Sequence, residues 1–292
     1  MSNDTSSGNP PESCAEPAYA KLNLALHVRR RREDGYHDIE TLFAFCEDGD
    51  ELIVQPAEDL ALFVSGPFGG ELLGEAAEDN LVMRAARALQ AHTGRTRGAA
   101  LTLIKRLPVG SGVGGGSADA AAALRLLSRF WSLDLAEAEL EALGAELGAD
   151  VPACLRSRPA RGEGTGTHMQ PSYLGALVGK PVLLVNPGVH VSTPQIFRAW
   201  DGVDRGALGV GDALQIARSG RNDLTAPACA LVPEIRNILE LLGGDPPALL
   251  ARMSGSGATC FAVYEGADSR DLMARRIETD HPNWWLMRSR LR

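Results

Sequence analysis

The feature that most constrains this sequence is a glycine-rich segment in its middle, Leu107 to Ser117, which reads LPVGSGVGGGS. It lies between a predicted strand, Ala100 to Leu107, and the strongest predicted helix, Ser117 to Trp131, which is rich in alanine and leucine. Glycines let the backbone approach an anion closely and take positive φ, and the free amides of a helix N-terminus attract negative charge. Five glycines in seven residues before a helix therefore favour a phosphate-binding loop over a flexible loop without a ligand.

Several known phosphate-loop types can be compared with this segment. Gly110, Gly112 and Gly115 satisfy the G-x-G-x-x-G pattern of dinucleotide-binding oxidoreductases. That fold needs a second strand ending in Asp or Glu about 20 residues on, whereas two consecutive helices are predicted over Ser117 to Leu147. A Walker A loop would close with Gly-Lys-Ser/Thr, and a protein kinase would carry H-R-D and D-F-G downstream; the sequence has neither. The oxidoreductase remains the alternative from another functional class.

The chain before the loop is predicted to form a hairpin, short strands and one helix. Apolar residues alternate from Ala18 onward, so that Leu22, Leu24, Leu26 and Val28 share one face of a strand while Lys21, Asn23, Ala25 and His27 share the other. A turn at Arg30 to Gly35 and a returning strand at His37 to Phe45 complete the hairpin. Asp79 or Asn80 can cap a helix that carries Leu81, Ala85 and Leu89 on one face.

The chain after the loop changes character. A helix that Asp134 caps ends at Gly148, and the glycine-rich stretch Arg161 to Gly166 is the expected junction between two domains. Beyond it the pattern indicates a strand at Pro181 to Asn186, two helices, and a closing strand, turn, strand, helix and strand. This order is typical of an α+β domain that follows an α/β domain.

Composition limits the compartment and the partners. A formal net charge of −8 disfavours nucleic-acid binding, and no run of about 18 uncharged apolar residues is present for a membrane span. The five cysteines form no C-x-x-C pair, which is typical of free thiols in a reducing cytosol. The first 17 residues, rich in Ser, Pro, Asn and acidic groups, are expected to be a disordered tail. We therefore expect a cytoplasmic protein that binds neither nucleic acid nor membrane.

Three segments together resemble the three ordered motifs of the GHMP kinase superfamily: Pro17 to Leu24, Leu107 to Ala118 and Met253 to Ala258. The resemblance runs from about Ala18 to the C-terminus. It implies a two-domain fold, α/β plus α+β, with a ribosomal protein S5 domain 2-like N-terminal domain and a ferredoxin-like C-terminal domain. We accordingly expect a tail at residues 1–17, an ATP-binding domain at 18–168 and a C-terminal domain at 169–292, with the site between the two domains.

Further segments narrow the resemblance to one branch of the superfamily: Asp34 to His37, Gly148 to Pro152 and Asn186 to Val189. That branch phosphorylates the 2-hydroxyl of a diphosphocytidyl-methylerythritol in the non-mevalonate route to isoprenoid precursors. The resemblance thus implies ATP and Mg²⁺ as cofactors, this small molecule as the partner, and a monomer or weak homodimer. The alternatives are another GHMP kinase that acts on mevalonate or homoserine and, from another class, the dinucleotide-binding oxidoreductase.

The resemblance also implies a catalytic pair, with Asp150 as the base and Lys21 beside it. The chemistry is reasonable, because a tertiary alcohol is a poor nucleophile and a carboxylate can accept its proton during phosphoryl transfer. A neighbouring ammonium keeps the carboxylate ionised. From the residues alone, Asp150 is more often a turn or cap residue and Lys21 a solvated surface residue than a catalytic pair.

The remaining implied site residues fall into two groups. The ATP group comprises the phosphate loop and two positions near the adenosine: Pro108, Val109, Gly110, Ser111, Gly112, Val113, Gly114, Gly115, Gly116, Ser117, Ala118, Asn80 and Lys105. The substrate group is Asn23, Tyr36, His37, Thr193 and Phe197, with the aromatic rings stacking on cytosine and His37 reading its polar edge. Ser254 to Gly257 would close over the phosphates, Ser117 could contact Mg²⁺ through its hydroxyl, and no carboxylate ligand can be assigned to the metal.

Overall fold

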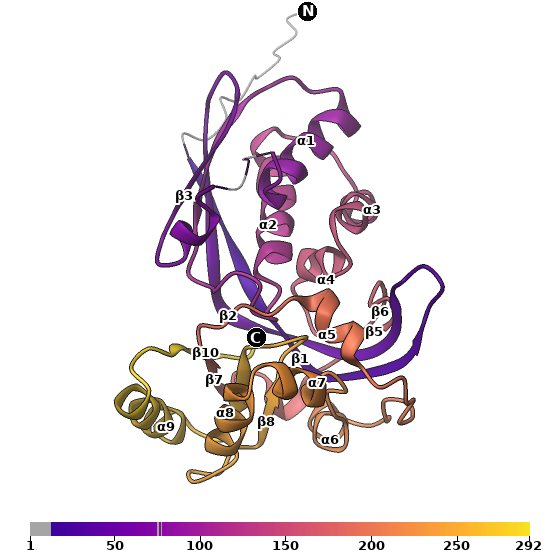
Figure 1. The fold of residues 1–292 in the computed structure, drawn as a ribbon. Helices are drawn as coiled ribbons and strands as arrows, with labels where there is room; N and C mark the ends of the chain where they lie inside the picture. The colour runs from indigo at the N-terminus through magenta and orange to yellow at the C-terminus, as the bar shows by residue number, and fades with distance from the viewer. Residues whose placement is uncertain (1–12, 75, 77) are drawn as a thin grey trace, which may run out of the picture.

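The computed structural model describes residues 13–74, 76 and 78–292, which form two domains stacked end to end, each a layer of β-sheet with packed helices (Figure 1). The first layer is a six-stranded sheet in the order β3-β4-β2-β5-β6, with β1 paired to β2. Its strands are β1 (Cys14–Arg31), β2 (His37–Gln55), β3 (Leu60–Ser65), β4 (Ala99–Ile104), β5 (Ala160–Gly164) and β6 (His168–Pro171). All neighbours are antiparallel except β3 and β4, which are parallel.

Helices cover one face of this sheet (Figure 1). They are the 3-10 turn η1 (Gly69–Leu72) and the helices α1 (Leu81–Thr93), α2 (Gly115–Phe130), α3 (Glu137–Leu147) and α4 (Val151–Arg156). Asn80 caps α1 as expected, because its side chain accepts a hydrogen bond from the amide of Val82 at 2.9 Å. The predicted cap Asp134 is wrong, since α3 begins later and Glu139 accepts from the amide of Ala136 at 2.9 Å instead.

The second layer is a four-stranded antiparallel sheet in the order β10-β7-β9-β8. Its strands are β7 (Pro181–Asn186), β8 (Leu250–Met253), β9 (Cys260–Val263) and β10 (Trp285–Arg290), and its helices are η2 (Gly175–Leu177), α5 (Thr193–Ala199), α6 (Ala213–Ser219), α7 (Thr225–Leu231), α8 (Glu234–Leu242) and α9 (Ala267–Asp280). Counted within the domain, the strand order is 4-1-3-2 with helices between the first and second and between the third and fourth strands. This is the ferredoxin-like arrangement that the sequence predicted.

The β1–β2 hairpin joins the two layers. Alternation predicted one buried and one more polar face for β1, but Lys21, Asn23 and His27 are buried as well as the leucines. The reason is that α2 packs on one side of the hairpin and the second sheet on the other, so neither face meets solvent. Three register shifts, beginning between Tyr19 and Lys21, adjust which way successive side chains point.

Alternation along the second sheet shows how the domains share a core. Leu183 and Val185 pack beneath the helices of the second domain, whereas Val182 and Leu184 pack with Leu22, Leu24 and Leu42 of the hairpin. Backbone bridges from Leu26 to Asn222 and from Cys46 to Leu291 cross the same boundary. The interface is therefore continuous apolar packing with backbone pairing.

Two predicted boundaries differ from the structure. Strand β1 begins at Cys14, so the last residues assigned to a tail are part of the sheet, while residues 1–12 lie outside the described residues. The boundary predicted between 168 and 169 falls inside β6, which pairs with β5 in the first sheet. Residues 172–180, between the two sheets, are where we place the junction.

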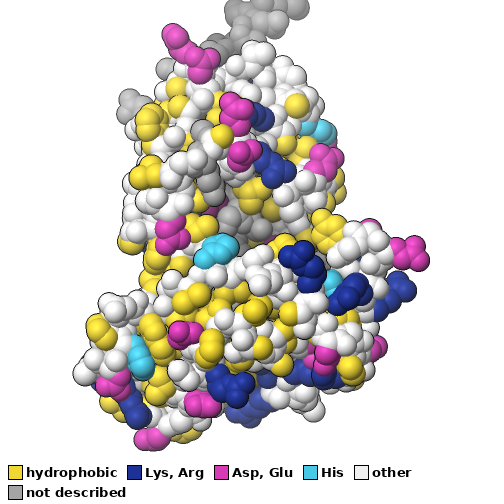
Figure 2. All heavy atoms as spheres, viewed as in Figure 1, with side chains coloured by type: hydrophobic (Ala, Val, Ile, Leu, Met, Phe, Trp, Pro, Cys, Tyr) yellow, Lys and Arg dark blue, Asp and Glu magenta, His cyan; other side chains and the backbone are white. Residues whose placement is uncertain are grey.

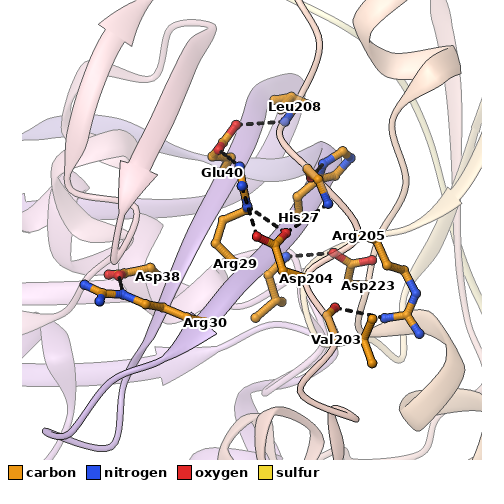
Figure 3. A network of polar contacts seen from close by, with 12 residues as sticks. His27, Arg29, Arg30, Asp38, Glu40, Val203, Asp204, Arg205, Leu208 and Asp223 are labelled. Carbon is orange, nitrogen blue, oxygen red and sulfur yellow. Dashed lines mark hydrogen bonds and ion pairs between the residues drawn. The ribbon is translucent and has the colours of Figure 1, made fainter.

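Polar side chains fix the far end of the hairpin to the segment after α5. Arg29 of β1 pairs with Glu40 of β2 and with Asp204, and Leu208 donates its amide to the same glutamate at 2.8 Å (Figure 3). The amide of Val28 donates to Asp223 at 2.8 Å. In the part of the chain that the structure describes, no helix has the length and apolar character needed to cross a bilayer.

Candidate active site

A cavity of about 820 Å³ lies between the two domains, and Figure 2 shows this face of the molecule hollowed there. Its walls come from the hairpin, the glycine loop, the N-terminus of α4, α5 and the turn after β8. Of the predicted phosphate-loop residues, Val109 to Gly112 and Gly114 to Ser117 line it. Pro108, Val113 and Ala118 are buried away from it, so these three belong to the core beneath the loop.

The loop takes its shape from glycines that touch other backbones and side chains. Gly112 has φ +80°, and a Cβ there would lie 2.5 Å from the carbonyl oxygen of Ser254. Gly114, with φ +67°, is the N-cap of α2, and a Cβ there would lie 3.1 Å from Cε of Lys21. A side chain at either position would be strained and crowded, so glycine is required. The first amides of α2 are thereby presented to the cavity, as an anion site requires.

Lys21 and Asp150 meet at the cavity wall. Lys21 Nζ is 3.1 Å from Asp150 Oδ2, and the lysine side chain is 4% exposed while the aspartate side chain is 38% exposed. Asp150 stands at the N-cap of α4 but makes no capping hydrogen bond. Lys21 is therefore not a surface residue. Asp150 lies in a turn, but its side chain does not cap the helix that follows.

Asn23 orients this lysine. Its Oδ1 accepts from Lys21 Nζ at 2.8 Å, and its Nδ2 donates to Oγ1 of Thr41 at 2.8 Å. Thr41 in turn donates to the carbonyl of Ala25 at 2.7 Å. Because Thr41 Oγ1 is a donor to that carbonyl, it must accept from the amide nitrogen, which fixes the orientation of Asn23.

The turn after β8 packs on the glycine loop from the other domain. Ser254, which is fully buried, donates from Oγ to the carbonyl of Gly112 at 2.9 Å and accepts from the amide of Asn23 at 3.3 Å. Asn222 holds the turn from beneath, donating to the carbonyls of Met253 and Gly255 at 2.8 Å each. Asn222 is 31 residues before Met253 in the sequence, so this contact is seen only in the fold.

Aromatic side chains gather at the opposite end of the cavity. His37 lies 4.9 Å from Phe197 and 5.8 Å from Trp200 between ring centroids. Tyr36, His37, Phe197 and Thr193 all line the cavity, and Tyr36 is 62% exposed. His37 is buried because these two aromatic rings cover it. Burial, followed by the charge of Arg31, lowers its pKa.

Lys105 and Asn80 line the cavity, but their side chains have structural partners. Asn80 caps α1, and Lys105 Nζ pairs with Asp50 and, at 2.9 Å, with Asp119. Burial lowers the pKa of Lys105, but the charges of Asp119 and Asp50 outweigh burial and raise it overall. We call Lys105, Asp50 and Asp119 the buried triad. The expectation that the Lys105 side chain approaches adenosine is therefore not what its contacts favour.

Asp50 and Asp119 are site residues that the sequence did not reveal. Asp119 lies four residues after Gly115, on the same face of α2, which was the available signal. Within the described residues no cluster of three or more His, Cys, Asp or Glu side chains could hold a metal ion. The hydroxyl of Ser117 lines the cavity beside the first amides of α2, so the donor set suits a cation that arrives with a phosphate ligand.

Comparisons with known proteins identify the family of the chain. The model of the GHMP kinases N terminal domain matches residues 80–158, and that of the GHMP kinases C terminal matches 207–283. The 4-diphosphocytidyl-2-C-methyl-D-erythritol kinase of Rhizorhabdus wittichii is 52% identical, over 97% of each chain. That of Novosphingobium aromaticivorans is 50% identical, over 96% of this chain and 93% of its own.

Solved structures give the same result. A crystal structure of 4-(cytidine 5'-diphospho)-2C-methyl-D-erythritol kinase superposes with a TM-score of 0.75 at 33% identity, covering 95% of this chain and 99% of that one. Homoserine kinase from Cytophaga hutchinsonii shares the fold, with a TM-score of 0.71 at 16% identity over 96% of this chain and 95% of its own. The chain belongs to the GHMP kinases and, among them, to the family of the 4-diphosphocytidyl-2-C-methyl-D-erythritol kinases.

Proposed function

We propose that this chain transfers the γ-phosphoryl group of ATP to the 2-hydroxyl of 4-diphosphocytidyl-2-C-methyl-D-erythritol, in the non-mevalonate route to isoprenoid precursors. The observation that carries the proposal is the position of the Lys21–Asp150 pair. The pair lines the cavity. The glycine loop forms one wall of this cavity, and the aromatic cluster of Tyr36, His37 and Phe197 forms another. A phosphoryl donor and a cytidyl acceptor can therefore lie on opposite sides of one ion pair.

In this mechanism Asp150 accepts the proton of the 2-hydroxyl while the oxygen attacks the phosphorus. Its 38% exposure leaves an oxygen open to the cavity, while Oδ2 contacts Lys21 Nζ at 3.1 Å. The Lys21 ammonium, held by Asn23 at 2.8 Å, can donate to the transferring phosphoryl group without moving. Catalysis then depends mainly on positioning and charge stabilisation, as in other phosphoryl transfers.

The glycine loop holds the polyphosphate in this proposal. The amides from Gly114 to Ser117 open α2 and face the anion, where the helix dipole also favours negative charge. Mg²⁺, bound together with ATP, would neutralise charge on the phosphate oxygens, and Ser117 is the residue that would hold it. Ser254 keeps the loop in place from the C-terminal domain.

The aromatic cluster holds the cytosine. Tyr36 and Phe197 present faces on which a base can stack, and His37 can read the polar edge of the base as a neutral imidazole. Thr193, whose Oγ1 is 2.8 Å from Oγ of Ser256, lies where the rest of the substrate would pass. Asn23 acts chiefly on Lys21, and the second proton of its Nδ2 remains for a substrate contact.

A coupled assay of ADP release tests the proposal. The purified chain is given Mg-ATP with the cytidyl substrate, with mevalonate or with homoserine, at equal concentrations. We expect turnover with the cytidyl substrate to exceed that with either small alcohol by at least about 10³-fold, because the small alcohols leave the aromatic cluster empty. Preference for mevalonate or homoserine would reject the cytidyl assignment and keep the kinase assignment. Binding of NAD without binding of ATP would reject both.

A further inference from the structure

Four consecutive arginines, Arg29 to Arg32, lie at the end of β1 and at the start of the turn that follows it. Three of them pair with carboxylates: Arg29 with Glu40 and Asp204, Arg30 with Asp38, and Arg32 with Asp34 and Asp38. Arg31 pairs with no carboxylate of the described residues and donates instead to an imidazole and to two carbonyls. Its role therefore differs from that of its neighbours.

The guanidinium of Arg31 joins the two sides of the aromatic cluster. Its Nε donates to Nε2 of His37 at 3.4 Å, on the hairpin side. Its Nη2 donates to the carbonyls of Arg198 and Trp200 at 3.3 Å each, at the C-terminal end of α5, where carbonyls lack partners within the helix and a cation is favoured. Because α5 also carries Phe197, whose ring centroid is 4.9 Å from that of His37, Arg31 connects the two rings through their backbones.

The contact with Arg31 also decides which nitrogen of His37 carries the proton. A guanidinium has donors only, so Nε2 must accept with its lone pair. In the neutral ring the proton is then on Nδ1. Burial, followed by the charge of Arg31, lowers the pKa of His37 from 6.5, which keeps the ring neutral at pH 7.

Nδ1 is the ring nitrogen of His37 that is left for a ligand. No group of the described residues forms a hydrogen bond with Nδ1, and it is not one of the buried polar atoms that lack a partner there, which are Asp119 Oδ1, Trp200 Nε1 and Tyr264 Oη. Because His37 lines the cavity, an Nδ1–H donor is available to a base. Cytosine has an acceptor at N3, whereas uracil carries a proton there. A fixed donor can therefore pair with N3 of cytosine but meets another donor in uracil.

We propose that Arg31 is a positioning residue that makes the site selective for cytosine over uracil, by holding Nε2 of His37 as an acceptor and Nδ1–H as a donor toward N3 of the base. This rests on the proposed function in that the aromatic cluster holds the base of the substrate. It supplies a selectivity that stacking alone does not, because every base has a π-face. Arg31 itself is not among the residues that line the cavity, so it acts through His37.

The test compares the parent with Arg31→Ala, Arg31→Lys and Arg30→Ala. Each is given the cytidyl substrate and its uridyl analogue, and the readout is the ratio of the two kcat/KM values. A lysine ammonium is also a donor only, so Arg31→Lys keeps the acceptor role of Nε2. Arg30→Ala is the matched control, because it removes the neighbouring guanidinium, 74% exposed, from its pair with Asp38. The end of the hairpin keeps its tie from Arg29 to Asp204 at 2.9 Å, so Arg31→Ala should fold.

We expect Arg31→Ala to lower the cytidyl-to-uridyl ratio by roughly three- to tenfold, the scale of one hydrogen bond. Its kcat with the cytidyl substrate should stay within about twofold of the parent, because the base site is remote from the transferring group. Arg31→Lys and Arg30→Ala should keep the ratio of the parent. In a His37→Ala background, Arg31→Ala should change the ratio no further.

Several results would overturn the proposal. One is an unchanged ratio in Arg31→Ala, and another is a loss of the same size in Arg31→Lys or Arg30→Ala. A further loss in the His37→Ala background would show that Arg31 does not act through His37.

A second readout needs no turnover. Nitrogen NMR distinguishes protonated from unprotonated ring nitrogens, and the signals of His37 are assigned by their absence in His37→Ala. At about pH 8 we expect the parent to carry the proton on Nδ1, and Arg31→Ala to show a mixture of both tautomers. A proton on Nε2 in the parent would overturn the proposal. If the parent shows the expected tautomer but phosphorylates neither nucleotide substrate, the proposed function is rejected while the control of His37 by Arg31 stands.

Discussion

Replacing Asp150 by asparagine should separate catalysis from binding. Asparagine has the same shape and keeps an oxygen that can accept from Lys21, but it cannot take the proton of the acceptor hydroxyl. Loss of a general base reduces the rate by about 10²- to 10⁴-fold, which corresponds to about 2.7 to 5.5 kcal/mol of transition-state stabilisation. We therefore expect kcat to fall by at least about 10²-fold, with the KM for ATP nearly unchanged.

The structure also limits the effect of this variant on folding. Asp150 makes no capping hydrogen bond to α4, and its side chain is 38% exposed. Lys21 keeps Asn23 as an acceptor, so the loss of one partly exposed ion pair should cost about 1 kcal/mol or less. A lower kcat therefore cannot be attributed to unfolding if the urea midpoint is close to that of the parent.

The assay is coupled ADP release at saturating ATP and cytidyl substrate. Asp280→Asn, at the C-terminal end of α9, makes the same chemical change in the second domain and should leave kcat at the parent value. A kcat of Asp150→Asn within about threefold of the parent would refute the reasoning and return Asp150 to the role of a turn residue.

Three further predictions concern the substrate, the pH response and the core. Phe197→Ala should raise the KM for the cytidyl substrate by roughly ten- to a hundredfold, since stacking is worth about 1 to 3 kcal/mol per base, and the KM for ATP should stay constant. His27 is buried, with Nδ1 3.0 Å from the carbonyl of Gly206 and Nε2 accepting from the amide of Arg221 at 3.2 Å. Burial lowers the pKa of His27 from its unfolded value of 6.5. The contribution of His27 to stability is therefore present above pH 6.5 and is lost as the pH falls. In urea unfolding, His27→Gln should lose less stability than the parent between about pH 7.5 and 5.5. Phe261→Ala should cost about 3 to 5 kcal/mol in the same measurement and leave a single unfolding transition, because Phe261 belongs to the core that both domains share.

For each of these three predictions, one experimental result would contradict it. An unchanged KM of Phe197→Ala would exclude stacking of the substrate on that ring. An equal acid response in His27→Gln and the parent would mean that the buried imidazole does not control it. Two separate transitions in Phe261→Ala, one for each domain, would show that the shared core does not couple them.

The sequence predicted the parts of the site that short motifs encode. The glycine loop, Lys21, Asp150 and the aromatic residues all line one cavity, as expected from local pattern and from the family resemblance. The glycine loop could be predicted from the sequence because its shape depends on glycines that lie within a few residues of each other. The ferredoxin-like C-terminal domain was expected from the family resemblance, and its strand order has that arrangement.

The misjudged features depend on packing between distant segments. Lys105 was assigned to adenosine from the family resemblance. Its pairing with Asp50 and Asp119, which are 55 and 14 residues away, has no signal in the sequence. The burial of His37 could not be predicted, because Trp200, one of the rings that cover it, comes from the other domain. Both faces of β1 are buried for a related reason. The glycine loop of the first domain covers Lys21 and the second sheet covers Leu22 and Leu24, and alternation within one strand cannot indicate either neighbour.

The shared core also limits how this protein could be recombined with its relatives. The C-terminal sheet turns Val182, Leu184, Phe261 and Val263 toward the N-terminal hairpin, where Leu22 and Leu24 meet them. Consider a chimera that joins the N-terminal domain of this chain to the C-terminal domain of a relative between residues 172 and 180. It would bring together two apolar faces whose side chains did not evolve to pack on each other. Mismatched volumes there would create cavities or steric clashes immediately behind Lys21 and Asn23, which lie on the same strand as the two leucines. Exchange of domains should therefore succeed only when the hairpin is exchanged together with the C-terminal sheet.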